Sequence, residues 1–126
     1  MLDAIDHVQL AAPAGCEDAA RRFFGELLGL QEMAKPEALR GRGGVWFRVG
    51  AQQLHVGVEE GFSAARKAHP AFTVSRYDEL QRRLRAAGVE IADDDSVPGV
   101  RRCFVDDPWG NRLELVEGLI RGRFCR

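Results

Sequence analysis

The chain repeats one order of predicted secondary structure, and this internal repeat limits the possible folds more than any other feature of the sequence. Hydrophobic periodicity predicts, in the first half, a strand at 5–11, a helix at 17–28, a short strand at 30–33, a loop at 35–43 and strands at 44–49 and 53–58. The same order returns in the second half, with a strand at 69–75, a helix at 78–87, a short strand at 89–92, a loop at 93–99 and strands at 101–105 and 112–116. The sequence therefore predicts an α+β fold made of two tandem βαβββ modules.

Glycines mark equivalent points of the two modules. Gly29 and Gly88 each follow a predicted helix, where a C-terminal cap is expected, and Asp78 is expected to cap the N-terminus of the second helix. His55 lies 26 residues after Gly29, and Glu114 lies 26 residues after Gly88. Two side chains that can bind metal or carry protons therefore fall at corresponding places in the two halves.

Length and composition exclude several classes of protein. A chain of 126 residues can bury one core, so we expect a single domain with modules at 1–60 and 68–118 and a basic tail at 119–126. A net charge of −1 is not typical of a nucleic-acid-binding protein, and no apolar run is long enough to cross a membrane. The three cysteines lack the spacing of a disulfide framework or a zinc site. We therefore expect a cytoplasmic protein.

Strand alternation gives each predicted sheet an apolar face and a polar face. The apolar faces should pack on the helices, and the other face then carries His7, Gln9, Trp46, Arg48, His55, His69, Thr73 and Glu114. A solvated sheet surface is one explanation of such a set. The set nevertheless contains all three histidines of the chain, and three imidazoles with one carboxylate suit a divalent ion of Zn, Ni, Co, Mn or Fe. The candidate metal ligands are therefore His7, His55, His69 and Glu114.

Four side chains near these ligands are candidates for substrate contact. Arg48 could hold a carboxylate or phosphate, although a salt bridge at the rim explains it equally well. Arg102 and Phe104 share the polar face if the alternate residues of their strand face the helices. Trp46 and Phe104 could form an apolar wall for an organic molecule, or they could pack in the core or in a dimer interface. A small-molecule substrate is thus indicated.

Five segments, at 6–10, 23–30, 69–74, 84–89 and 106–115, carry a family resemblance. The last reads D-D-P-W-G-N-R-L-E-L. It is similar to the D-P-x-G-N-x-x-E-L signature of the vicinal oxygen chelate superfamily, which includes glyoxalases, bleomycin resistance proteins and extradiol dioxygenases. The resemblance implies a half-open, cup-shaped mixed β-barrel flanked by helices, with one divalent metal ion per site. It also implies a homodimer.

The resemblance assigns roles to the candidate ligands. His7, His69 and Glu114 take the places of the two histidines and the glutamate that bind metal in the fosfomycin-resistance thiol transferases. His55 takes the place of a glutamate of glyoxalase I, so strict glyoxalase I activity is not favoured. Glu114 and His55 are the candidate catalytic residues, although a metal-bound His55 would have no lone pair with which to act as a base.

The function that the resemblance implies is that of a glyoxalase-like metalloprotein. It would be a divalent-metal-dependent lyase, isomerase or thiol transferase that acts on a small, oxygen-rich, anionic metabolite or xenobiotic. Two alternatives stay open because one fold supports several activities. One is a metal-free protein that binds a drug or metabolite, as bleomycin resistance proteins do, and the other is a small Fe(II)-dependent dioxygenase.

Overall fold

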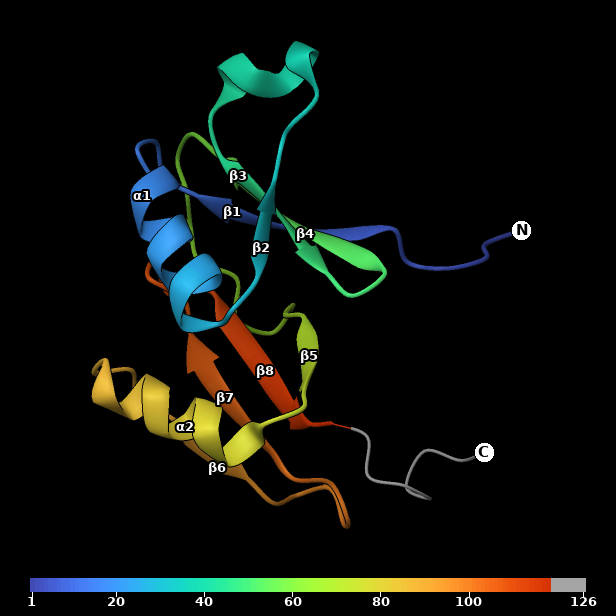
Figure 1. Cartoon of the computed structure of the whole chain (residues 1–126), viewed down its shortest axis with the longest axis vertical. Helices are drawn as coiled ribbons and strands as arrows, with labels where there is room; N and C mark the ends of the chain where they lie inside the picture. The colour runs from blue at the N-terminus through green and yellow to red at the C-terminus, as the bar shows by residue number, and fades with distance from the viewer. Residues whose placement is uncertain (119–126) are drawn as a thin grey trace. The chain divides into compact units, whose positions relative to one another are not determined.

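A computed structural model describes residues 1–118 of the chain, and the predicted basic tail at 119–126 lies outside the described residues. The chain divides into two compact units, the first spanning Met1–Ala64 and the second beginning at Ala65. Each unit contains one mixed four-stranded sheet with its own helix (Figure 1).

Unit 1 contains the first βαβββ module. Its elements are β1 (His7–Ala12), α1 (Glu17–Ala20), the π-helix η1 (Arg21–Leu27), β2 (Gln31–Met33), the 3-10 helix η2 (Glu37–Arg42), β3 (Val45–Val49) and β4 (Gln52–Val58). The strands lie in the order β1-β4-β3-β2, with β1 parallel to β4 and the other pairs antiparallel. The apolar sheet face packs on the helix, where the Phe24 and Phe47 rings lie 5.8 Å apart.

Unit 2 repeats this arrangement. Its elements are β5 (Ala71–Val74), α2 (Tyr77–Ala86), β6 (Ala92–Asp94), β7 (Arg102–Asp106) and β8 (Arg112–Glu117). The strand order β5-β8-β7-β6 matches that of unit 1, and β5 is parallel to β8 as β1 is to β4. Leu84 of α2 is fully buried together with Cys103 and Leu113 of the sheet. The prediction of an α+β fold with two tandem βαβββ modules is confirmed.

The first helix differs from the prediction in its winding. Only its first turn is α-helical, and the rest is a π-helix in which the Leu28 amide donates to the Phe23 carbonyl at 2.9 Å. The wider turn lets two consecutive aromatic residues, Phe23 and Phe24, both pack into the core. Gly29 follows with a φ of 79°, as expected for a glycine that ends a helix.

Two predictions for the second module are wrong. Asp78 does not cap α2, because the N-cap residue is Arg76, and Asp78 lies in the first turn, where it pairs with Arg101. The short strand lies at 92–94 instead of 89–92, since the Val89 amide still bonds to the helix at the Leu84 carbonyl. The acidic residues 93 and 94, expected in a loop, are therefore strand residues that pair with β7.

The predicted loop at 35–43 also contains regular structure, the 3-10 helix η2. None of the helices in the described part of the chain combines the length and the apolar character that a membrane span requires.

Candidate functional site

The strand register defines one face of the unit 1 sheet. His55 of β4 lies beside Gln9 of β1 and Trp46 of β3, while His7 and Arg48 both lie beside Gln53. Neighbouring residues in a register point to the same side, so these side chains share the face opposite the helix. Arg48 is exposed to solvent on this face.

His55 is held between two other rings. The Trp46 ring stacks on the His55 ring, with centroids 3.6 Å apart and an interplanar angle of 2°. The His7 ring also stacks on His55, with centroids 4.2 Å apart and an interplanar angle of 18°. Nε2 of His55 lies 2.8 Å from Oε1 of Gln53. Because burial and the adjacent His7 both disfavour a positive charge, the pKa of His55 is held below its ordinary value. His55 is therefore a fixed, neutral imidazole.

The stack limits how the two histidines can share a metal ion. An imidazole binds a metal along the lone pair of a ring nitrogen, which lies in the ring plane. Two nearly parallel rings cannot both direct such a lone pair at one ion, so joint ligation requires His7 to turn. His7 is the more exposed of the two, with 42% of its side-chain surface accessible, and its Nδ1 lies 2.9 Å from Oδ2 of Asp6.

Unit 2 brings together His69 and Glu114. Nδ1 of His69 lies 3.0 Å from the Lys67 carbonyl oxygen, which can only accept, so this nitrogen carries a proton. Nε2 of His69 then faces Oε1 of Glu114 at 3.0 Å. Burial raises the pKa of Glu114, but hydrogen bonds from His69 and Arg102 outweigh that effect and hold it below its ordinary value. Nε2 of His69 and Oε1 of Glu114 are thus close enough either to share a proton or to bind one metal ion together.

Arg102 is the second partner of Glu114. Its Nη1 donates to Oε2 of Glu114 at 2.9 Å, and its Nη2 donates to Oδ2 of Asp94 at 3.0 Å. Phe104, next but one along β7, stands edge-on to the His69 ring, with centroids 5.5 Å apart. The predicted substrate contacts Arg102 and Phe104 thus border the His69–Glu114 pair, and Arg102 holds the carboxylate of that pair.

The signature segment 106–111 forms a buried polar turn. Asp107 accepts hydrogen bonds from the Trp109 and Asn111 amides at 3.0 and 2.8 Å, and its second oxygen accepts from Nδ2 of Asn111 at 2.8 Å. Gly110 adopts a φ of 95° that the turn requires. Asp107 and Asn111 are both almost inaccessible to solvent.

This turn holds the connector that carries His69. Oδ1 of Asn111 accepts from the Ala65 amide at 2.9 Å, and the Ala65 carbonyl accepts from the Arg112 amide at 2.9 Å. Further along, the Glu114 amide donates to the Pro70 carbonyl at 3.0 Å. The connector therefore lies along β8, and His69 is positioned beside Glu114. The sequence analysis used the signature only as evidence of a family resemblance and did not predict that it positions the connector. The Asp and Asn of the signature are the residues that could have indicated this role.

The candidate ligands are thus found as two pairs, one in each unit. Unit 1 contains His7 and His55, and unit 2 contains His69 and Glu114. Within residues 1–118, neither unit by itself gathers three or more His, Cys, Asp or Glu side chains in a metal-binding group.

The sequence and the structure of the chain were compared with those of known proteins. The model of the Glyoxalase/Bleomycin resistance protein/Dioxygenase superfamily matches residues 4–115. A Bacillus anthracis protein assigned to the glyoxalase family has a crystal structure that is similar to this chain at a TM-score of 0.90 and 50% identity, covering 94% of this chain and 98% of that one. No curated protein sequence matches the chain.

Two further crystal structures share the fold at lower identity. Lactoylglutathione lyase from Agrobacterium tumefaciens has a TM-score of 0.72 and 22% identity, covering 93% of this chain and 95% of that chain. A variant of the fosfomycin resistance protein FosX from Listeria monocytogenes, complexed with Mn(II) and 1S,2S-dihydroxypropylphosphonic acid, has a TM-score of 0.77 and 20% identity, with both chains covered completely at 100%.

Proposed function

The chain belongs to the glyoxalase, bleomycin resistance protein and dioxygenase superfamily, and from this membership we propose that it is a metal-dependent enzyme. It acts as a lyase, isomerase or thiol transferase on a small, oxygen-rich, anionic metabolite or xenobiotic. The proposal is supported by the structural likeness to a lactoylglutathione lyase and to a FosX crystallised with Mn(II). The metal is a divalent ion of Zn, Ni, Co, Mn or Fe.

One observation carries the metal proposal. The proton on Nδ1 of His69 is fixed by the Lys67 carbonyl, which leaves Nε2 facing the Glu114 carboxylate. Metal-bound histidines commonly donate their second ring N–H to a carbonyl or carboxylate in this way. His7 has the corresponding contact with Asp6 in unit 1. The nitrogen and oxygen donors present therefore fit a divalent ion of intermediate hardness.

We assign the proposed ligands as His7, His69 and Glu114, with His55 as either the fourth ligand or the base. Oε2 of Glu114 already accepts from Arg102 and Oε1 faces Nε2 of His69, so we assign Glu114 as a metal ligand and not as the proton acceptor. With its Nε2–H donated to Gln53, neutral His55 has its lone pair on Nδ1.

The chemistry divides between the ion and the side chains. A bound divalent ion would supply Lewis-acid stabilisation for negative charge that develops on vicinal oxygens of the substrate. The stack with Trp46 keeps the His55 ring in one plane, so that Nδ1 can accept a proton from a fixed direction. Arg102 holds the Glu114 carboxylate and prevents it from rotating.

Elemental analysis of the purified protein tests the proposal, together with metal-dependent thermal unfolding. The variants are His7→Ala, His55→Ala, His69→Ala and Glu114→Ala, and Glu117→Ala on the same strand as Glu114 is the matched control. We expect near-stoichiometric metal in the wild type and the control, and loss of metal in the His7, His69 and Glu114 variants.

The His55→Ala variant separates its two roles. Retained metal with lost turnover would identify His55 as the base, and lost metal would identify it as a ligand. A wild-type protein that binds no divalent metal, yet binds a small molecule equally well in EDTA, would overturn the proposal in favour of a metal-free binding protein.

We further propose that the chain is a homodimer and acts in the cytoplasm. Chains of this superfamily commonly pair, and its free, buried thiols Cys16 and Cys103 are compatible with a reducing compartment. Light scattering coupled to gel filtration tests the dimer, since each chain contributes 14.0 kDa.

A further inference from the structure

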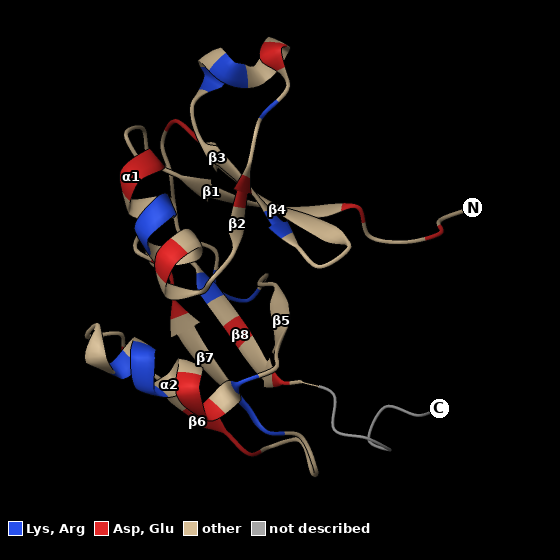
Figure 2. Cartoon of the chain, in the orientation of Figure 1, with Lys and Arg blue, Asp and Glu red and all other residues tan. Residues whose placement is uncertain are grey.

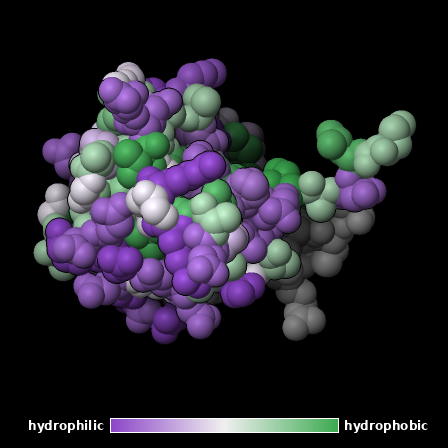
Figure 3. Space-filling view, turned by 90° about the horizontal axis from the view of Figure 1, so that it is seen from above, coloured by the Kyte–Doolittle hydropathy of each residue, from purple (hydrophilic) through white to green (hydrophobic). Residues whose placement is uncertain are grey.

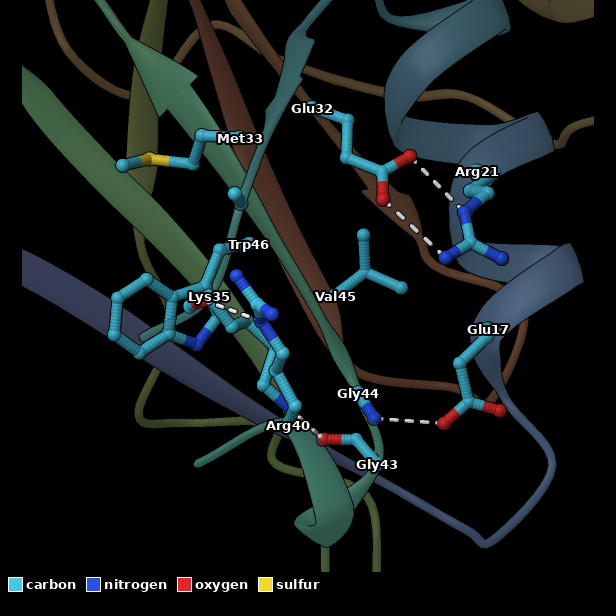
Figure 4. A pocket seen from close by; sticks show the side chains of 11 residues that line it. Glu17, Arg21, Glu32, Met33, Lys35, Arg40, Gly43, Gly44, Val45 and Trp46 are labelled. Carbon is cyan, nitrogen blue, oxygen red and sulfur yellow. Dashed lines mark hydrogen bonds and ion pairs between the residues drawn. The ribbon is translucent and has the colours of Figure 1, made fainter. Parts of the chain in front are cut away.

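A cavity of about 340 Å³ lies entirely within unit 1. It opens between the start of the first helix, β2, the η2 turn and the start of β3, as Figure 4 shows from close by. Its wall includes acidic, basic and apolar side chains. The partners of the charged groups decide what it can bind.

The acidic side chains in the wall are already satisfied. Glu32 accepts two hydrogen bonds from Arg21, at 3.0 and 3.2 Å. Oε2 of Glu17 accepts from the Gly44 amide at 2.6 Å, and this bond holds the pKa of Glu17 below its ordinary value. Both pairs lie on one side of the cavity in Figure 4. Neither carboxylate therefore needs a ligand cation.

The two basic side chains on the opposite side keep most of their hydrogen-bonding capacity. Lys35 donates one N–H to the Gly43 carbonyl, and Arg40 donates its Nε–H to the Lys35 carbonyl at 3.2 Å. A lysine has three donors and an arginine has five. Among the described residues, neither side chain has an acidic partner in an ion pair. Figure 2 shows basic residues in the η2 turn of unit 1.

Next to these cations the wall is apolar. Met33 and Trp46 are register neighbours on β2 and β3 and line the cavity together with Val45. Trp46, Lys35 and Arg40 all line this cavity and are labelled in Figure 4. Trp46 is also the ring that stacks on His55. The cavity thus combines unused cationic donors with an apolar surface that continues to a candidate catalytic residue.

We propose that this cavity binds the oxyanion group of a small organic acid, a carboxylate or phosphonate held by Lys35 and Arg40 with its carbon skeleton against Met33 and Trp46. The inference rests on the proposed function and gives its substrate a defined class and orientation. The anionic group lies at η2, and the rest of the molecule extends along Trp46 toward His55. From the sequence, Arg48 was the candidate for holding an anion and Arg102 a candidate substrate contact, but Arg102 is held by two carboxylates.

Titration with phenylphosphonate in the presence of EDTA tests this site, because the chelator removes any contribution from a metal. Isothermal calorimetry measures the affinity, and NMR follows the two tryptophan indole N–H signals. We expect the Trp46 signal to shift and the Trp109 signal to stay. Benzyl alcohol, which has the ring without the charge, should not bind.

Charge-neutral variants locate the site. Arg40→Gln should weaken phenylphosphonate binding by roughly tenfold or more, as expected for the loss of a charged hydrogen-bond donor. Lys35→Gln should have a similar effect, and circular dichroism checks its folding because Lys35 also bonds to Gly43. Arg42→Gln is the matched control, since Arg42 lies in the same turn but not in the cavity wall.

The outcomes are separable from those of the metal experiment. Absence of phenylphosphonate binding in the wild type, or an equal loss in Arg42→Gln, would overturn the anion site and leave the metal content of the histidine variants unchanged. Conversely, a protein without metal would still show this titration if the site exists.

Discussion

At the residue scale, the most consequential side chains in unit 2 are two that touch neither of the candidate ligands. Asp107 and Asn111 bond to each other inside the turn, and Asn111 also holds the connector through Ala65. Burial raises the pKa of Asp107 above its ordinary value, although the hydrogen bonds from Asn111 and the turn amides act in the opposite direction. The family signature predicts which residues occur here. It does not reveal that they position His69.

Asn111→Ala should lower the free energy of unfolding by about 2–4 kcal/mol, because the buried Asp107 carboxyl and the Ala65 amide both lose a partner. Urea denaturation measures the change. Asp106→Asn in the same turn is the control, since Asp106 is half exposed and its pair with Arg66 should contribute less than about 1 kcal/mol. Equal effects of the two substitutions would contradict the special role of Asn111.

Glu17 provides a pH-dependent contribution to stability. Its folded pKa is depressed by the Gly44 amide, so the contribution is present above the unfolded pKa and is lost as the pH falls through the folded pKa. Glu17→Gln should cost about 1 kcal/mol at pH 7. The difference from wild type should disappear in acid, and denaturation from pH 7 down to pH 3 measures it. A constant difference across this range would show that the carboxylate charge is not responsible.

At the element scale, periodicity predicted both modules because each strand and helix has one apolar face. It could not predict the π-helical winding of η1, which depends on how Phe23 and Phe24 pack against the sheet. It also could not place β6, since the acidic residues there have tertiary partners, with Asp93 bonded to Gln81 and Asp94 paired with Arg102. Local composition favoured a loop at residues 93 and 94, but tertiary interactions stabilise a strand there.

The η2 turn joins β3 through a glycine that no other residue can replace. A Cβ on Gly44 would lie 2.1 Å from the Val56 carbonyl oxygen, and its φ is 89°. Gly44→Ala should therefore cost at least about 2 kcal/mol of unfolding free energy. Gly41→Ala in the same turn meets no atom within 4 Å and should be neutral or slightly stabilising. Thermal unfolding of the two variants compares them directly, and a tolerated Gly44→Ala would show that the sheet can shift to accept it.

At the scale of the whole molecule, alternation and the repeat predicted which strand residues share the polar faces of the two sheets, but His69, predicted in a strand at 69–75, lies in the connector before β5. They could not predict side-chain partners within a face. Side-chain rotamers, which strand periodicity does not determine, decide these contacts. Examples are the stacking of His55 with His7 and Trp46 and the hydrogen bond from Arg102 to Glu114. The cavity at Lys35 and Arg40 was missed for a related reason, because its wall includes a turn that the sequence described only as a loop.

Metal removal should affect the stability of the whole protein. An ion present at a hundredfold excess over its Kd stabilises the folded state by about 2.7 kcal/mol, which corresponds to a rise in Tm of roughly 10 °C for a chain of this size. EDTA should reverse the rise in the wild type and have no effect on Glu114→Ala. A Tm that is insensitive to both metal and EDTA would argue against a resident ion.

Apolar side chains are also exposed at the start of the chain. Met1, Leu2 and Ile5 are the most accessible of the large hydrophobic residues, and the N-terminal segment projects at the right of the space-filling view in Figure 3. If these side chains lie in the proposed dimer interface, Leu2→Ser with Ile5→Ser should shift the light-scattering mass toward that of one chain, 14.0 kDa. An unchanged dimer mass would place the interface elsewhere.

The ring stack has an optical consequence. Indole is the main emitter in protein fluorescence, and a protonated or displaced imidazole in face contact changes its emission. Trp46 therefore converts the state of His55 into a spectral signal. Metal loading, proton transfer and substrate arrival at His55 can all be followed by the light that the protein itself emits, before any substrate has been identified.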